Sequence, residues 1–162
     1  MTIQILGALT TATTVVAVDT DDRKLETARQ MGADEVLLSG DEAITRIRDL
    51  TGQQGAEVII DMVGIDPTLR MAAQVARVRG HVTIVGLGGG ALPVDFASPP
   101  HECSVASPYW GSLPELMEVI TLAQQKKIRM LVEHFPLERA DAAYQLLHHG
   151  KARGRAVITP HA

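Results

Sequence analysis

The chain has 162 residues, of which 46% are hydrophobic and 21% charged, and a formal net charge of -4. This length fits one domain that can bury a core, and the negative charge argues against a nucleic-acid or acidic-membrane partner. The single cysteine, Cys103, excludes an internal disulfide and a four-cysteine zinc site. Because no apolar run reaches the ~18 residues of a membrane span and the start lacks a basic signal region, we expect a cytoplasmic protein.

The first third of the chain alternates between helix and strand patterns. Residues 3–10 resemble the end of an apolar helix with no cap before it, and residues 14–19 form an apolar strand that ends in an acid. A second helix follows, with N-cap candidates at residues 20–22 and a stop at Gly32. Residues 35–38 predict a short strand, and residues 39–42 have the spacing of a capping box that opens a third helix.

The middle of the chain repeats this alternation. Residues 58–63 predict a buried strand, and Asp66-Pro67 predicts a helix start with Asp66 as the N-cap. Gly80 is expected to end the following turn, before a strand over residues 81–85. Residues 86–90 form a glycine-rich strand exit, and three nearby prolines favour irregular structure after it.

The last third predicts a short strand near Val105, then an amphipathic helix opened by the capping box Ser112–Glu115. A strand over residues 132–135, a helix over residues 140–147 and a strand over residues 156–159 complete the chain. Alternating strands and helices indicate an α/β fold with a parallel sheet. The nearly continuous apolar strands agree with burial of both sheet faces.

Asp19 is the sharpest functional candidate. A carboxylate at the carboxyl end of a parallel strand can accept hydrogen bonds from an adenosine ribose, and it repels a 2′-phosphate, which favours NAD over NADP. In such units a G-x-G-x-x-G loop lies about 20 residues before the acid, a position before Met1 in this chain. The alternative is that Asp19 is a helix cap or a turn acid, and methyltransferases with a similar sheet also carry an acid there.

Other chemical motifs give weaker signals. The glycine run 86–90 does not open a helix, so it is not predicted to bind a phosphate; it could contact a nicotinamide or be a plain loop. Arg153 and Arg155 could clamp a diphosphate or form a solvated basic turn. The histidines lack metal-pair spacing, no nucleophile elbow is present, and we predict no catalytic base. The histidines are residues 81, 101, 134, 148, 149 and 161.

Five segments, taken together, resemble one known family. They are VVAVDTDDRKLETARQMGADEVL, GAEVIIDMVG, GHVTIVGLGGG, SPYWGSLPELMEV and GRAVITP. In this order and spacing they resemble the C-terminal half of zinc-dependent medium-chain alcohol dehydrogenases, closest to the bacterial secondary-alcohol dehydrogenases. The resemblance covers essentially the whole chain.

The resemblance implies a set of cofactor-binding residues. Asp19 corresponds to the acid that binds the ribose, and Lys24 to a basic residue near the adenosine. Val63 and Gly64 match a loop that lines the cofactor cleft, and Val85, Gly86 and Leu87 match a strand end at the nicotinamide. Arg155 matches an arginine that reaches the cofactor diphosphate. We expect NAD as the cofactor.

The resemblance also implies the domain organisation. Residues 1–130 correspond to a NAD-binding Rossmann domain whose parallel sheet, flanked by helices, lacks its first strand and Gly-rich loop. Residues 131–162 correspond to a segment that returns to the catalytic domain. The family's zinc ligands lie in an N-terminal domain without a counterpart here, and its strand near Val105 pairs with a second copy, so a homo-oligomer is expected.

Two functions follow from these expectations. The first is the NAD-binding half of an oxidoreductase that interconverts a small alcohol and a ketone or aldehyde, catalytically inactive by itself. The alternative is a non-catalytic dimerisation or assembly module that pairs with an intact dehydrogenase. A methyltransferase is disfavoured because the segments after Asp19 match the dehydrogenases throughout.

Overall fold

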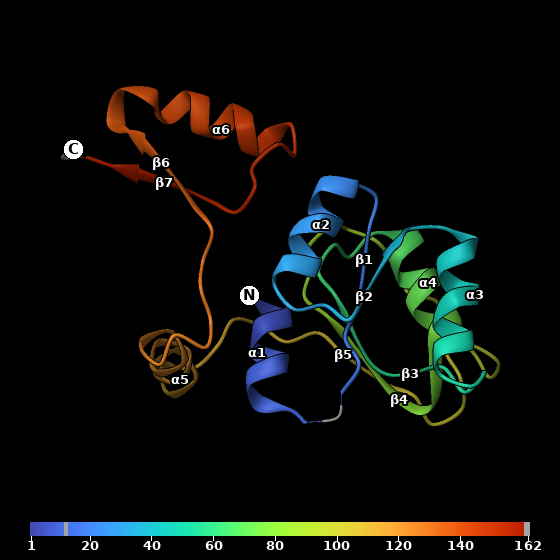
Figure 1. The fold of residues 1–162 in the computed structure, drawn as a ribbon. Coiled ribbons are helices and arrows are strands. Elements are labelled where there is room, and N and C mark those ends of the chain that lie inside the picture. Colours follow the sequence, from blue (N-terminus) through green and yellow to red (C-terminus); the bar gives the residue numbers. More distant parts are fainter. Residues whose placement is uncertain (12, 161–162) are drawn as a thin grey trace. The chain divides into compact units, whose positions relative to one another are not determined.

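The structure is a computed structural model that describes residues 1–11 and 13–160. His161, one of the histidines considered above, and the end of the predicted 131–162 segment lie outside the described residues. The chain forms two compact units, one made of residues 1–37 and the segment from Met117 onward, the other of residues 38–116 (Figure 1). Each unit is described by itself below.

The first unit begins with α1 (Thr2–Leu9), β1 (Val16–Asp19), α2 (Asp22–Gln30) and β2 (Glu35–Leu38). Strands β1 and β2 pair in a two-stranded sheet, and α2 packs against β1. Asp21 caps α2 as expected, because its side chain accepts a hydrogen bond from the Arg23 amide at 2.9 Å. These elements lie close to the predicted ranges.

The same unit contains the end of the chain. Helix α5 (Leu113–Gln124), most of which lies in this unit, is followed by β6 (Val132–Pro136), a 3-10 turn (Leu137–Arg139), α6 (Ala140–His148) and β7 (Arg155–Thr159). Strands β6 and β7 are parallel, with Val132 opposite Arg155, and α6 is the connection between them (Figure 1). The structure therefore confirms a β-α-β unit at the C-terminal end.

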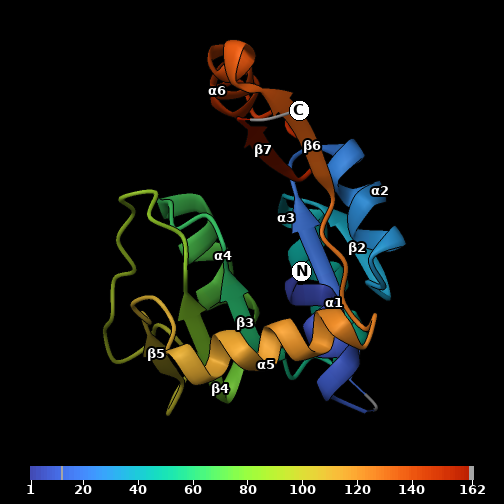
Figure 2. The same cartoon turned by 90° about the vertical axis from the view of Figure 1, so that its left-hand side faces the viewer.

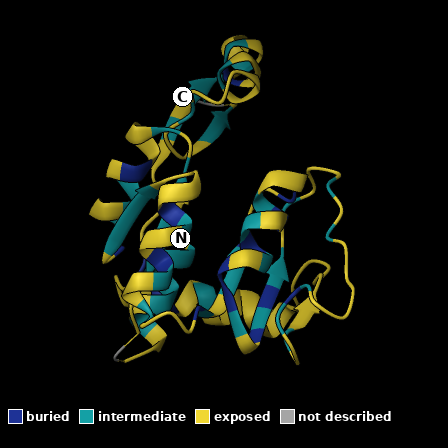
Figure 3. Ribbon diagram, turned by 90° about the vertical axis from the view of Figure 1, so that its right-hand side faces the viewer, coloured by how far each residue is buried: buried dark blue, intermediate teal, exposed yellow. Residues whose placement is uncertain are grey.

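The second unit contains α3 (Asp41–Leu50), β3 (Ala56–Asp61), α4 (Asp66–Val75), β4 (Ala76–Ile84) and β5 (Ser104–Ala106). These strands form one parallel sheet in the order β3-β4-β5, and α4 packs against β3 and β4 (Figure 2). Buried residues gather between α4 and the sheet (Figure 3). They are Leu69, Ala72, Val75, Ala76 and Val82.

The structure corrects several predicted boundaries in this unit. Strand β3 ends at Asp61 instead of residue 63, because the Asp61 carboxylate binds the next amides and turns the chain. The N-cap of α4 is Ile65, and Asp66 is already in the first turn. Gly80 lies inside β4, where the pairing with β3 is irregular, and does not end a turn. The predicted capping box at 39–42 is also wrong, because Gly40 is the N-cap of α3.

The α/β class with parallel strands is confirmed, and the strands of the described residues are distributed over three sheets. The apolar face predicted for α5 is present but exposed; Leu113, for example, is 71% exposed. Among the described residues, none of the helices has the length and apolar character that a bilayer crossing requires.

Candidate functional site

Asp19 is the last residue of β1, where its carboxylate organises the turn into α2. Its Oδ1 accepts hydrogen bonds from the amides of Thr20, at 2.8 Å, and Asp21, at 3.1 Å. The Lys24 ammonium lies 3.9 Å from the same oxygen, and the Asp19 side chain is 35% exposed. The second oxygen, Oδ2, has no hydrogen-bond partner among residues 1–11 and 13–160. It is therefore free to accept a ligand hydroxyl.

The neighbouring acid, Asp21, pairs with an arginine instead of with turn amides alone. Its two carboxylate oxygens bind the Arg23 guanidinium at 3.1 and 2.7 Å, and this pairing lowers the pKa of Asp21 to about 2. The bidentate pair occupies Arg23 and leaves Lys24 as the cation that faces Asp19.

An open hollow of about 270 Å³ lies beside this turn, within the first unit. It is lined from α2 by Lys24 and its neighbours and from the α6–β7 connection by residues 150–154. Arg155 follows directly as the first residue of β7, with an exposed side chain. The structure thus brings Asp19 and Lys24 together and places Arg155 next to a connection that borders the same hollow.

In the second unit, two loops leave the carboxyl ends of β3 and β4. We call residues 62–66 and 85–91 the loop pair. The amides of Val85 and Gly86 donate to the Asp61 carbonyl, and the amides of Gly88 and Gly90 donate to the carbonyls of the other loop. The two loops therefore run alongside each other, joined by backbone hydrogen bonds beyond the end of the sheet.

Glycine is required where the two loops touch. Gly64 has φ +70, and a Cβ there would lie 2.2 Å from the Gly86 carbonyl oxygen. A Cβ on Gly86 would lie 2.1 Å from the backbone of Val63. Side chains at these positions would collide with main-chain atoms. The glycine run thus serves close packing of two loops.

The loop pair presents apolar side chains to its surroundings. Leu87 is 99% exposed, and Met62, Val63 and Val85 are each about half exposed. Ligands of open α/β sheets bind beyond the carboxyl ends of the strands, where these side chains stand. They can pack against the flat face of an aromatic ligand.

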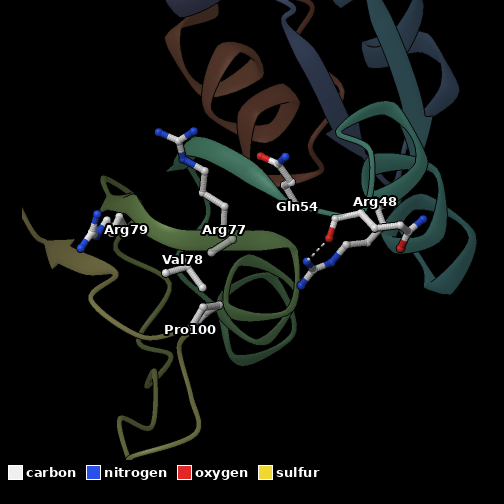
Figure 4. A pocket seen from close by; sticks show the side chains of 8 residues that line it. Arg48, Gln54, Arg77, Val78, Arg79 and Pro100 are labelled. Atoms are coloured by element: carbon white, nitrogen blue, oxygen red, sulfur yellow. Dashed lines mark hydrogen bonds between the residues drawn. The ribbon is translucent and has the colours of Figure 1, made fainter.

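Another hollow of the second unit lies at the opposite end of the sheet, where β4 begins (Figure 4). Its volume is about 670 Å³ and its lining includes Arg48, Arg77 and Arg79. These cations are already engaged: Arg77 pairs with Glu57, Arg79 with Glu102, and Arg48 with backbone carbonyls. It is therefore a weaker candidate for a ligand site than the carboxyl ends.

The described residues do not fit a zinc ion. Across residues 1–11 and 13–160, no three His, Cys, Asp or Glu side chains lie close enough together to hold a metal.

The predicted site residues fall into two groups, one in each compact unit. Asp19, Lys24 and Arg155 belong to the first unit, and Val63, Gly64, Val85, Gly86 and Leu87 to the second.

Sequence reasoning missed Asp61, which binds both loops, and Thr68, whose hydroxyl donates to the Asp61 carboxylate at 2.7 Å. It also missed Asp66, whose carboxylate accepts the Ala91 amide at 2.8 Å. The available signal was an acid that ends an apolar strand shortly before a glycine.

The sequence profile of one family, described as zinc-binding dehydrogenase, matches residues 1–125. The chain belongs to the zinc-binding dehydrogenase family.

Individual relatives agree with this family membership. The chain is 31% identical over 160 residues to D-arabinose 1-dehydrogenase (NADP(+)) of Saccharolobus solfataricus, covering 98% of this chain and 46% of that protein. It is also 31% identical over 165 residues to an NAD-dependent alcohol dehydrogenase of Sulfurisphaera tokodaii, covering 99% and 47%.

A solved structure is similar over the same region. The alcohol dehydrogenase of Aeropyrum pernix has 32% identity and a TM-score of 0.87, over 98% of this chain and 46% of that one. This zinc-binding dehydrogenase chain therefore spans about half the length of the curated relatives it matches.

Proposed function

We propose that this chain binds NAD as the cofactor-binding half of an alcohol-dehydrogenase-type oxidoreductase. The observation that carries the proposal is the geometry of Asp19. Its Oδ1 is held by two turn amides, and Oδ2 has no partner among the described residues. A fixed carboxylate with one unoccupied oxygen suits the ribose hydroxyls of an adenosine.

The first unit supplies the residues for the adenosine side. Asp19 accepts hydrogen bonds from the ribose, and its charge repels a 2′-phosphate, so NAD is preferred over NADP. The Lys24 ammonium, 3.9 Å from the Asp19 carboxylate, lies near the adenosine. Arg155 donates to the diphosphate. A relative named for NADP(+) therefore differs in cofactor from what we propose here.

In the second unit, considered by itself, the loop pair offers residues that suit a nicotinamide. Val63 and Gly64 lie on one loop, and Val85, Gly86 and Leu87 lie on the other. We call these five residues the nicotinamide-side wall. The exposed apolar side chains of Val63, Val85 and Leu87 exclude water from the ring. NAD, when bound, supplies the hydride acceptor for oxidation of a small alcohol to a ketone or aldehyde.

We propose further that the chain by itself does not turn over substrate. It spans about half the length of its relatives, and its described residues do not fit the metal for which the family is named. Incubation with secondary alcohols and NAD, followed by absorbance at the NADH wavelength, tests this directly. Steady NADH production would contradict it.

Titration of NADH into the chain tests cofactor binding. We expect Asp19→Asn to weaken NADH binding by about 10- to 100-fold, as for loss of charge-assisted hydrogen bonds. It should weaken NADPH binding less, or strengthen it. Asp22→Asn is the matched control, because Asp22 is an exposed acid of the same turn. Equal effects of the two substitutions would count against the proposal.

One observation favours the assembly module as a second candidate. Strand β5 is at the edge of its sheet, and all three of its residues are exposed. An exposed edge strand is a template for pairing with another chain, here a second copy.

A further inference from the structure

We propose that Asp61 is a positioning residue that holds the loop pair at one fixed separation and so sets the geometry of the nicotinamide-side wall. Asp61 itself does not reach that wall, because it is only 6% exposed. The role of Asp61 toward the cofactor rests on the proposed NAD binding. The coupling between the two loops rests on the hydrogen bonds alone.

The Asp61 side chain fixes the first loop. Its Oδ1 accepts the amides of Val63, at 2.8 Å, and Gly64, at 2.9 Å. Its Oδ2 accepts the Thr68 hydroxyl at 2.7 Å. A buried carboxylate is costly unless its lone pairs are satisfied, and three donors satisfy this one. Since Thr68 lies in the first turn of α4, the carboxylate ties the loop to a helix.

The Asp61 main chain fixes the second loop. Its carbonyl accepts the amides of Val85, at 2.8 Å, and Gly86, at 3.0 Å. One residue therefore binds both loops at their roots, with its side chain directed to one and its carbonyl to the other. A rotation of the Asp61 backbone would move both together.

The contacts farther out transmit such a movement along the loops. The Gly88 amide donates to the Val63 carbonyl at 3.0 Å, and the Gly90 amide donates to the Gly64 carbonyl at 2.8 Å. At Gly64 and Gly86 the two backbones approach so closely that an added Cβ would overlap the opposite main chain, which leaves little space for independent motion of the loops. The exposed side chains of Val63, Val85 and Leu87 therefore take positions determined at Asp61.

If Asp61 served only to fill buried space, an apolar residue at this position would serve equally well. Among the described residues Asp61 is the only charged residue that is buried, and a charge at such a place gives orientation at a cost in stability. The hydrogen bonds that its carboxylate and its carbonyl accept come from the two loops and from Thr68 of α4. This allocation is what a positioning residue requires.

The test uses two substitutions and two matched controls in the full chain. Asp61→Asn keeps one oxygen for the amides but removes the charge and the second acceptor. Thr68→Val removes only the hydroxyl and keeps the shape, so it remains informative if the first variant folds poorly. Asp49→Asn and Thr45→Val are the same changes at exposed positions of α3, away from the loops.

The first readout is amide hydrogen exchange by NMR, which needs no cofactor. We expect Asp61→Asn to raise the exchange rates of the Val63, Gly64, Val85 and Gly86 amides about tenfold. Thr68→Val should raise them less, and the controls should leave them unchanged. A rise confined to Val63 and Gly64 would overturn the coupling, and so would an equal rise of every amide in β3 and β4, which marks a general loss of stability.

The second readout is the dissociation constant for NADH. We expect it to rise about fivefold to tenfold in Asp61→Asn and to stay unchanged in the controls. Faster loop exchange with unchanged NADH affinity would overturn the positioning role. If the wild-type chain does not bind NADH, the proposed function and the role toward the cofactor both fail, while the exchange data still decide whether Asp61 couples the loops.

Discussion

Two acids only two residues apart, Asp19 and Asp21, have different roles because they meet different amides. The alternative interpretation of Asp19 as a helix cap is wrong, since Asp21 caps α2. The alternative of a turn acid holds in part, because one Asp19 oxygen binds turn amides. That binding fixes the carboxylate and leaves its second oxygen for a ligand. The structural and functional interpretations are therefore compatible at this residue.

The lowered pKa of Asp21 predicts an acid-sensitive helix start. The pKa is about 2 in the folded chain, below its ordinary value of 3.8, so the stabilisation is fully present above about pH 4. It is lost as the pH falls through about 2. We expect the free energy of urea unfolding to fall over this range in the wild type.

Asp21→Asn is the control for this pH dependence, because Asn also caps helices but does not titrate. The variant should be less stable at pH 7 and lose less stability on acidification. Identical pH profiles for the two proteins would show that another carboxyl group is responsible.

At the scale of the element, the sequence predicts what depends on neighbours along the chain. The Ser112–Glu115 spacing gives a true capping box, in which the Glu115 carboxylate accepts the Ser112 amide and its own amide approaches the Ser112 hydroxyl. The Ser112 amide and the Ser112 hydroxyl both donate to the Glu115 carboxylate, and these two hydrogen bonds lower the pKa of Glu115. The same spacing at residues 39–42 fails because the helix begins one residue later, after Gly40. The spacing alone does not decide which residue precedes the first helical turn.

The loop pair shows what the sequence could not predict. Each loop follows an apolar strand, and only the family resemblance predicts that residues of these loops contact the cofactor. Their backbone hydrogen bonds join residues more than 20 positions apart, and no local pattern encodes such a pairing. The sequence pattern therefore places Asp61 in the middle of a strand, although Asp61 ends that strand and binds both loops.

The close contact in the loop pair predicts a large effect of one methyl group. Gly86→Ala places a Cβ 2.1 Å from the Val63 backbone, and relief requires main-chain movement. We expect a loss of about 2 kcal/mol or more in the free energy of unfolding, measured by urea titration. Gly7→Ala in α1 is the control, since nothing lies within 4 Å of its added Cβ, and it should stabilise by roughly 0.5–1 kcal/mol. Equal, small effects would contradict the close approach.

At the scale of the whole molecule, the exposed edge at β5 predicts self-association. We expect the wild-type chain to sediment as a dimer at high concentration and to dissociate on dilution. Val105→Lys should shift it to the monomer, because a charge on an edge strand opposes pairing. Val94→Lys, at an exposed position outside β5, should leave the dimer intact. A wild-type chain that is monomeric at every concentration would rule out the assembly through β5.

The close fit of the two loops in the second unit also limits how their sequences can be exchanged between proteins. An added Cβ on Gly64, Gly86, Gly88 or Gly90 would meet main chain of the other loop, and Asp66 reaches across to Ala91. Grafting either loop alone from a homologue would bring together partners that were not selected for each other. A chimaera intended to alter cofactor or substrate preference should therefore carry residues 61–91 as a single cassette, with the intervening helix included.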